Sequence, residues 1–316
     1  MGVCRSATGY LRQMNILIAG GSGFVGSNLA TELLSRNHDV RVMTRHPKDR
    51  SDGVTDVFGD VADQSSLAAA LDGVDGAYYL VHSLDRDDFA EYDRAGATAF
   101  GHEAAAAGVR RVVYLGGLGN ENDDLSNHLK SRREVEHILM NEVPTTALRA
   151  GIVVGDGSVS WEILCQLIER LPIMITPRWV QTRTQPIALP DVVEYLADAV
   201  ELDAAGQHFD IGGPEALTYR EMLLAAAKQM HRRLLILPVP LLTPALSSHW
   251  LRLITDVDLK TARSLVDSMT NEVVVTERRI QELTGHQPMP FLEASQLALD
   301  DRAARKQRDK RDRDAS

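Results

Sequence analysis

The sequence predicts an α/β fold in which helices cover both faces of a doubly wound parallel sheet and a smaller helical lobe follows. Three observations support this. From Met14 onward, short apolar runs alternate with helical segments, the rhythm typical of parallel sheets. A glycine cluster separates the first run from the first helix. At 316 residues, the chain is long enough for a large sheet domain and an additional lobe.

The predicted strands and helices follow one another along the first half of the chain. Strands are expected at 15–19, 39–44, 76–81, 111–115 and 145–149, with a further strand ending before the segment FGDVAD. Helices are expected at 27–36, 65–71 and 87–107, and another opens in the stretch NHLKSRREVE, which starts at residue 127. The strands are short and rich in apolar residues, as expected of strands buried on both faces of a parallel sheet.

Composition and charge exclude several classes of protein. The formal net charge of −10 at pH 7 argues against a general nucleic-acid binder, because such a protein repels phosphates. Cys4 and Cys165 are far apart, so neither a disulfide framework nor a metal site is expected, and a reducing, cytoplasmic setting suits the chain best. We find no signal-peptide pattern, and no run of 18 apolar residues lacks a proline or a charge.

Both ends of the chain are expected to lie outside the fold. Residues 1–13 are predicted to be an extension without structure, although MGVCRS also matches a myristoylation pattern. Residues 301–316 hold seven Lys or Arg and four Asp, and a segment so charged and so poor in apolar side chains is predicted to be disordered. Phosphate or lipid binding by this tail is the sharper alternative.

The glycine cluster follows the first strand and opens the first helix. Its seven residues are Gly20, Gly21, Ser22, Gly23, Phe24, Val25 and Gly26, which satisfy both GxxGxxG and GxGxxG. The first glycine permits a tight turn, the middle one lets backbone approach a pyrophosphate, and the last lets the helix pack closely. The helix N-terminus adds N–H donors and a positive dipole end. The motif therefore predicts a dinucleotide-binding domain of the Rossmann type over residues 14–155.

The end of the second strand indicates which dinucleotide binds. NAD-binding domains usually place an Asp or Glu there to accept a hydrogen bond from the ribose 2′-hydroxyl. In this chain the segment 43–48 reads MTRHPK and holds no carboxylate. Arg45 could bind a 2′-phosphate, with Lys48 adding charge, so NADP(H) is favoured over NAD(H). Asp60 and Val61 fall where the third strand ends and are expected to meet the adenine.

Several longer motifs resemble those of a known family. YLVHSL at 79–84, YLGGLG at 114–119, HLKSRREV at 128–135 and LPIMITPRWVQTRTQPIA at 171–188 resemble motifs of atypical and extended short-chain dehydrogenases/reductases. More distantly, the chain resembles the nucleotide-binding accessory subunit of respiratory complex I and NADP-sensing nitrogen-regulator proteins. The resemblance covers nearly the whole chain and implies an NAD(P)H-binding Rossmann fold.

Residues at the expected catalytic positions depart from the family pattern. Catalytic members carry a Ser or Thr after the fifth strand and a Tyr-x-x-x-Lys helix that handles the proton. In this chain Gly116 follows the fifth strand, while His128 and Arg132 stand where the Tyr and Lys are expected. Arg132 could hold the nicotinamide ribose but not relay a proton, since arginine stays charged. His128 could donate a proton near neutral pH, although an exposed histidine is the blander interpretation.

Polar residues also follow the fourth strand. Val81, His82 and Ser83 lie at the carboxyl end of that strand, where open sheets bind their ligands. An ordinary loop explains His82 and Ser83 equally well.

The second half of the chain is expected to supply the substrate side. Residues 156–300 are predicted to form the helical lobe, with 185–212 returning to the sheet. Its apolar stretches 161–181 and 234–254 indicate a core, a lipophilic pocket or a face that docks on a membrane or a protein complex.

The sequence leaves two classes of function open. The first is an NADP(H)-dependent oxidoreductase acting on an apolar small molecule, with the proton supplied by His128, water or the substrate. Reduction of a polarised C=C bond would suit it best. The second is a redox-sensing or complex-assembly protein that holds NADP(H) without turnover. Loss of the triad favours the second class, whereas His128 and the apolar lobe favour the first.

Overall fold

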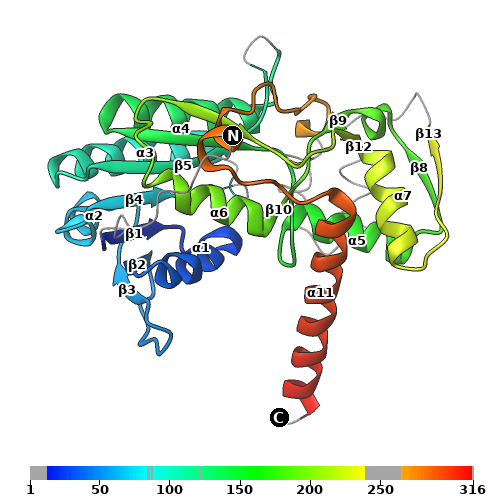
Figure 1. Cartoon of the computed structure of the whole chain (residues 1–316), viewed down its shortest axis with the longest axis horizontal. Helices are drawn as coiled ribbons and strands as arrows, with labels where there is room; N and C mark the ends of the chain where they lie inside the picture. Colours follow the sequence, from blue (N-terminus) through cyan, green and yellow to red (C-terminus); the bar gives the residue numbers. More distant parts are fainter. Residues whose placement is uncertain are drawn as a thin grey trace, which may run out of the picture.

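The chain folds around a seven-stranded parallel sheet (Figure 1). The computed structural model describes residues 13–314 apart from 84–85, 87, 121–122, 239–264 and 266. The strand order is β11-β6-β5-β4-β1-β2-β3. The strands are β1 (Asn15–Ala19), β2 (Asp39–Thr44), β3 (Thr55–Phe58), β4 (Gly76–Tyr79), β5 (Arg111–Gly117), β6 (Thr145–Ala150) and β11 (His208–Ile211). The predicted doubly wound α/β fold is confirmed.

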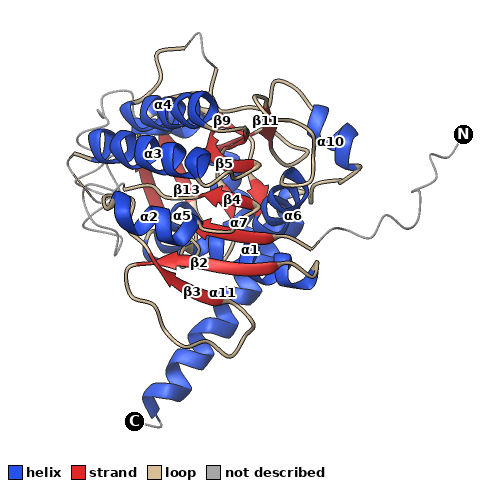
Figure 2. Cartoon of the chain, turned by 90° about the vertical axis from the view of Figure 1, so that its left-hand side faces the viewer, coloured by secondary structure: helices blue, strands red, loops and turns tan. Residues whose placement is uncertain are grey.

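Helices cover both faces of this sheet (Figure 2). One face carries α1 (Phe24–Ser35) and α6 (Leu189–Ala199); the other carries α2 (Gln64–Leu71), α3 (Phe89–Ala106) and α4 (Asn127–Glu142). Successive residues of β1 enter different cores, since Ile18 packs with α1 and α6 while Leu17 packs with α2 and α3. Both side chains are fully buried, which explains why the strands form continuous apolar runs.

The strand order creates a crevice at the centre of the sheet. From β1 the chain winds outward to β2 and β3, then crosses back to β4 on the other side of β1. The connections therefore leave β1 and β4 in opposite directions, and open α/β sheets bind ligands at such switch points. The strand order therefore predicts a ligand-binding site next to Ala19 and Tyr79, the last residues of β1 and β4.

The lobe has an apolar core of its own. It is built by α5 (Val159–Arg170), α7 (Tyr219–Gln229) and the start of α11 (Phe291–Asp314), with Trp161, Met222 and Phe291 among its buried members. The other elements outside the main sheet are β7 (Val153–Val154), β8 (Ile173–Thr176), η1 (Arg178–Gln181), β9 (Arg183–Thr184), β10 (Ile187–Ala188), β12 (Leu217–Thr218), β13 (Leu235–Pro238) and α10 (Arg279–Thr284). Between them, α6 and β11 return to the main sheet, so the lobe is built from separate segments of chain.

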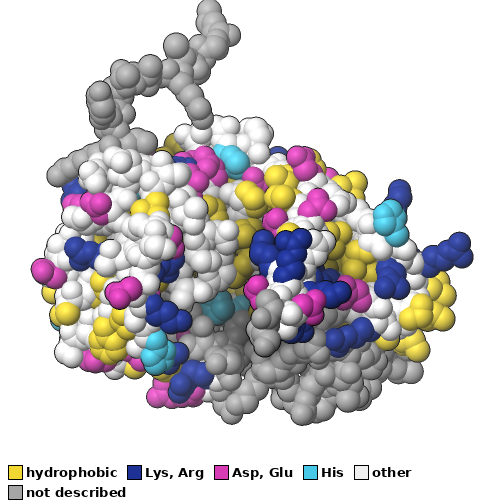
Figure 3. All heavy atoms as spheres, turned by 90° about the horizontal axis from the view of Figure 1, so that it is seen from below, with side chains coloured by type: hydrophobic (Ala, Val, Ile, Leu, Met, Phe, Trp, Pro, Cys, Tyr) yellow, Lys and Arg dark blue, Asp and Glu magenta, His cyan; other side chains and the backbone are white. Residues whose placement is uncertain are grey.

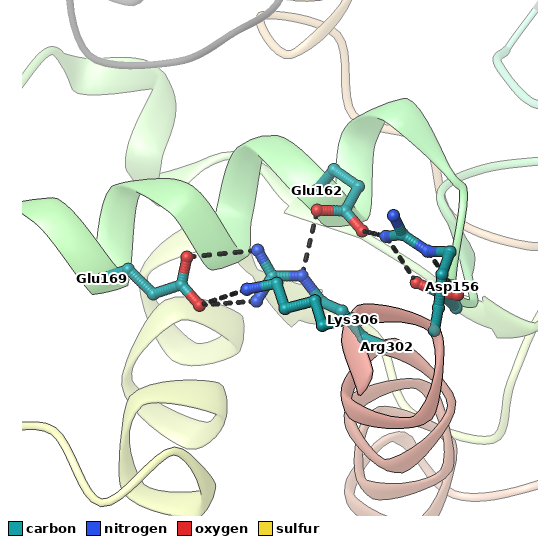
Figure 4. A network of polar contacts seen from close by, with 6 residues as sticks. Asp156, Glu162, Glu169, Arg302 and Lys306 are labelled. Atoms are coloured by element: carbon teal, nitrogen blue, oxygen red, sulfur yellow. Dashed lines mark hydrogen bonds and ion pairs between the residues drawn. The ribbon is translucent and has the colours of Figure 1, made fainter. Parts of the chain in front are cut away.

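The charged C-terminal segment is helical, contrary to the prediction. Helix α11 continues to Asp314 and projects from the body of the molecule (Figure 1). Its cations form ion pairs with carboxylates of α5 and the turn before it (Figure 4): Arg302, Arg305 and Lys306 face Asp156, Glu162 and Glu169. The prediction of a disordered tail over 301–316 is wrong for the described part, because these partners lie 133 to 149 residues earlier and leave no local signal.

Two predictions fall on residues that the structure does not describe. They are the N-terminal extension with its acylation pattern, up to residue 12, and most of the apolar stretch 234–254. Among the described residues, no helix has the length and apolar character needed to cross a membrane.

Candidate functional site

A large cleft opens over the switch point at the carboxyl edge of the sheet. Its volume is about 1000 Å³, which suits a ligand of dinucleotide size. The segments that follow β1 to β6 form much of its wall. Other parts of the wall come from the N-terminal halves of α4 and α5 and from residues later in the chain that include Tyr219, Met269 and Val273.

Most of the residues predicted from the sequence line this cleft. They are Gly20, Ser22, Gly23, Phe24, Val25, Gly26, Arg45, Asp60, Val61, Val81, His82, Ser83, Gly116, His128 and Arg132. Gly21 and Lys48 do not line it. A Cβ on Gly21 would lie 2.7 Å from Val42 Cγ2, so this glycine allows the loop to pack on β2. Lys48 lies in the exposed loop after β2, where its backbone N–H donates to Asp56.

The glycine loop has the geometry of a phosphate cradle. Gly20 has a positive φ of 86°, and a Cβ on it would lie 2.9 Å from the Leu80 carbonyl group, so only glycine fits between β1 and β4. A Cβ on Gly26 would overlap the Gly20 carbonyl oxygen, so glycine here lets α1 pack against the loop. Gly23 is the N-cap of α1 and forms no side-chain cap, so the first N–H groups of the helix are available to an anionic ligand.

One end of the cleft has the polar groups expected around adenosine. Asp60 Oδ1 accepts hydrogen bonds from the Ala62 N–H (3.0 Å) and the Tyr92 hydroxyl (3.4 Å). Burial and the Asp60 carboxylate raise the pKa of Tyr92, so this hydroxyl stays protonated. The Arg86 guanidinium lies 4.4 Å from the centroid of the Tyr92 ring. Arg45 lines the cleft from the end of β2 and forms no ion pair with any described residue.

Helix α4 forms another wall of the cleft, and Arg132 anchors it to the sheet. This buried arginine donates a hydrogen bond to the Leu115 carbonyl oxygen, and its guanidinium carbon lies 5.3 Å from the Tyr114 ring centroid. The Tyr114 hydroxyl donates in turn to the Arg132 carbonyl oxygen (3.0 Å). Arg132 therefore lines the cleft with some of its N–H groups already hydrogen-bonded to the protein. A hydrogen bond from Arg132 to a ribose remains a prediction.

His128 lies on the same wall, but its pKa does not suit the predicted proton donor. Burial, and to a lesser extent the positive charges of Arg132 and His82, lower the pKa of His128 from 6.5 to about 3. The imidazole is therefore neutral near pH 7 and has no imidazolium proton to give. This lowered pKa departs from the expected titration near neutrality, because the polar sequence around His128 does not reveal that the fold partly buries the residue in the cleft wall. A neutral imidazole still donates one N–H hydrogen bond.

The end of β5 packs against α4. A Cβ on Gly117 would lie 2.8 Å from Leu129 Cδ2, a terminal methyl group, so a serine there fits only if the Leu129 side chain shifts. Beside the neighbouring Gly116, Arg149 of β6 forms a buried bidentate ion pair with Glu136 of α4, at 3.0 and 2.5 Å. Helix α4 is therefore held against the sheet by packing and by this ion pair. The contacts lie beside Gly116 and Gly117, near the positions at which the family pattern leads us to expect a catalytic hydroxyl, Tyr and Lys.

Some residues of the cleft were not predicted. Ile152 and Val153 follow β6, so the rule that ligands lie at the carboxyl ends of strands could have found them. Tyr219 comes from one segment of the chain and Met269 and Val273 from another, and they meet only in the folded chain. No local pattern marks these three residues. Within the described part of the chain, no cluster of His, Cys, Asp or Glu could hold a metal ion.

The parallel sheet, the glycine loop at its switch point and the cleft define a dinucleotide-binding protein of the Rossmann type. Comparison with known proteins agrees, because residues 20–160 match the model of a family described as NAD(P)H-binding. The chain therefore contains an NAD(P)H-binding domain over these residues.

Individual relatives extend the comparison beyond this domain. The (4-alkanoyl-5-oxo-2,5-dihydrofuran-3-yl)methyl phosphate reductase of Streptomyces griseus is 29% identical over 289 residues, 87% of this chain and 95% of that protein. Sterol demethylase protein B of Methylococcus capsulatus is 34% identical over 115 residues, 34% of this chain and 35% of the relative. The NADPH complex of the Escherichia coli quinone oxidoreductase QOR2 has a TM-score of 0.71 at 20% identity, over 89% of this chain and 98% of that one. This last similarity shows a shared fold.

Proposed function

We propose that the protein is an NADP(H)-dependent oxidoreductase that reduces a carbonyl-conjugated C=C bond in a lipophilic small molecule. The loop from Gly20 to Gly26 would hold the pyrophosphate, Arg45 the 2′-phosphate and Asp60 the adenosine end. When bound, NADPH supplies a hydride. The remaining chemistry depends on the residues around the substrate.

The pKa values along the α4 wall support this class of reaction. Reducing a ketone requires a group that gives a proton to one oxygen atom, and neither His128, with a pKa of about 3, nor the permanently charged Arg132 does so near neutral pH. Burial also raises the pKa of Tyr219, on the lobe side of the cleft, which makes its hydroxyl a weak acid. Reduction of a conjugated C=C bond does not require such a residue, because the resulting enolate takes its proton at carbon and water can supply that proton.

His128 and Arg132 would then act as hydrogen-bond donors. A neutral imidazole N–H and the remaining N–H groups of Arg132 can stabilise negative charge on the substrate's carbonyl oxygen. The bond from Arg132 to the Leu115 carbonyl holds the guanidinium in place before the substrate arrives. Such preorganisation makes the donors more effective than water would be.

The lobe side of the cleft favours an apolar substrate. Ile152, Val159, Met269 and Val273 line it there. The reductase from Streptomyces griseus is named for a dihydrofuran whose C=C bond is conjugated with a lactone carbonyl and an alkanoyl group. The relative from Methylococcus capsulatus is named for a sterol. The sterol in the second name supports a lipophilic substrate class. The first name, that of a phosphate ester, supports a conjugated substrate.

Consumption of NADPH with a panel of substrates tests the reaction class. The panel pairs medium-chain enones and unsaturated lactones with saturated ketones of the same length. We expect the C=C bond to be reduced and the saturated ketones to be left unchanged, with products identified by mass spectrometry. Gly23→Val controls for cofactor oxidation outside the site. Comparable turnover of the saturated ketones would contradict the proposal.

We further propose that Arg45 selects NADP(H). Arg45→Asp should reverse the preference and weaken NADPH binding by about tenfold or more, since a hydrogen bond to a charged group contributes roughly 1.5–3 kcal/mol. Lys48→Asp makes the same charge change outside the cleft and should alter the ratio little. Fluorescence titrations with both dinucleotides measure the effect. Equal affinity of the parent protein for NADPH and NADH would contradict the proposal that Arg45 selects NADP(H).

A non-catalytic NADP(H) sensor is the second candidate. The neutral His128 and the packing around Gly117 favour it, because they leave α4 without a proton relay. This function predicts that the protein binds NADPH and NADP⁺ with different affinities and turns over no member of the panel.

A further inference from the structure

A two-stranded ribbon at the edge of the lobe presents an apolar face to solvent (Figure 1). Strands β8 and β13 pair in parallel, and the cross-strand partners on the outer face are Ile173 with Leu235 and Ile175 with Leu237. These four side chains are 45% to 56% exposed, whereas Met174 and Ile236 between them are 1% and 4% exposed and pack in the lobe core. Parallel strands are usually covered on both faces, so an uncovered face indicates a partner.

Cations lie beside this face on a chain whose net charge is −10. Lys228, His231, Arg232 and Arg233 are exposed on the last turns of α7 and the link to β13. None of the ion pairs among the described residues uses these four side chains. Glu169, near the end of α5, is already paired with cations of α11. At the edge where Figure 1 places α7 and β13, Figure 3 shows Lys, Arg and His side chains next to hydrophobic ones.

We propose that this ribbon face docks the protein on an anionic lipid bilayer. The four aliphatic side chains would enter the interfacial layer while the cations meet the anionic headgroups. A protein partner fits less well, because stable interfaces involve roughly 20–30 residues a side and this patch offers four apolar ones. The proposal goes beyond the proposed function and does not depend on it.

Sedimentation of the full-length protein with vesicles tests the proposal. We expect binding to phosphatidylcholine vesicles that contain about one-third phosphatidylglycerol, little binding to pure phosphatidylcholine, and weaker binding as salt is added. Ile173→Asp combined with Leu235→Asp should lower the partition coefficient by about tenfold or more, since both apolar side chains are lost from the interface. Arg232→Gln combined with Arg233→Gln should lower it by about 25-fold, at roughly fivefold per charge.

Two control variants separate the ribbon from other surfaces. Leu283→Asp changes a leucine of α10 that is 58% exposed and should bind vesicles as the parent does. Lys310→Gln combined with Arg311→Gln removes two exposed cations from the last turns of α11 and should also leave binding unchanged. Circular dichroism checks that every variant is folded.

Three results would overturn the proposal. The first is undiminished vesicle binding by both folded ribbon variants. The second is loss of binding only in the α11 variant, which would assign the anchor to that helix. The third is a dimer in sedimentation equilibrium that the ribbon variants convert to a monomer, which would assign the face to a second copy of the chain.

Discussion

Two walls of the cleft differ in what holds them in place. The glycine-loop wall depends on backbone, since Gly20 and Gly26 leave no room for side chains and no side chain caps the first N–H groups of α1. The α4 wall depends on side chains, through Arg132 at the Leu115 carbonyl and the buried pair of Glu136 with Arg149. The first wall has the features of a dinucleotide site, and the second has anchoring groups in place of a proton relay. We therefore expect cofactor binding and proton transfer to be separable by mutation.

The largest effect should come from breaking the buried ion pair of the α4 wall. Arg149→Met leaves the Glu136 carboxylate buried without its main partner, and breaking such a pair costs about 3–5 kcal/mol. Arg133 Nη1 lies 3.7 Å from Glu136 Oε1 and should offset part of the lost charge pairing. We therefore expect a loss near the lower end of this range. Urea unfolding measures the loss. Arg149→Met combined with Glu136→Leu removes both charges and should recover much of it, whereas an unchanged midpoint for the single variant would mean that the pair does not anchor α4.

Changing the other wall should affect binding and leave the fold intact. Gly23 has an ordinary φ of −80°, and a Cβ there would lie 3.2 Å from the Gly20 carbonyl oxygen, so Gly23→Val should fold. Its side chain would occupy the pyrophosphate's space and weaken NADPH binding by about a hundredfold or more, about 2.7 kcal/mol. Thermal melting and fluorescence titration together decide this. A folded variant that retains its affinity would show that the loop is not the cradle.

The neutral His128 makes a prediction about acid stability. Its folded pKa of about 3 lies below the ordinary 6.5, so the unfolded chain takes up a proton that the folded chain refuses. The free energy of unfolding should therefore fall as pH falls from about 6.5 towards 3, by about 2 kcal/mol between roughly pH 7 and pH 5 from this group alone. His128→Phe should remove that part of the slope. Parallel curves for parent and variant, from urea unfolding at several pH values, would contradict the assignment.

The smallest effect should come from changing Arg132, which is predicted to contact the cofactor from the α4 wall. Arg132→Gln should weaken NADPH binding by roughly 1–2 kcal/mol, the usual loss for hydrogen bonds from a charged donor. Any turnover should keep its pH profile, because arginine does not titrate in the accessible range. If the variant binds NADPH as tightly as the parent, Arg132 does not contact the cofactor, and its roles are the bond to the Leu115 carbonyl and the proposed one at the substrate oxygen.

The nucleotide side of the molecule could be predicted because its signals are local. A strand, a loop of four residues and a helix follow one another from Asn15 to Ser35, and Gly20, Gly21 and Gly26 mark positions where a Cβ has no space. The switch point follows from strand order, so residues at the carboxyl ends of strands, such as Arg45 and His82, could be expected at one cleft.

What the sequence did not reveal depends on distant partners. The lowered pKa of His128 results mainly from partial burial, which the polar residues around it in the sequence do not indicate. Helix α11 is stabilised by carboxylates of α5 and its preceding turn, far away in the chain. Lys48 lies only three residues after Arg45, yet the turn beyond β2 carries it out of the cleft. These errors arise from tertiary contacts and not from misjudged local propensity.

The contact between Gly117 and Leu129 has a consequence for how this chain could evolve or be redesigned. Gly117→Ser alone would require the Leu129 side chain to shift, and His128→Tyr alone would find no hydroxyl at position 117. We therefore expect that neither substitution by itself restores a proton relay. A designer would have to change the helix, the strand end and their packing together.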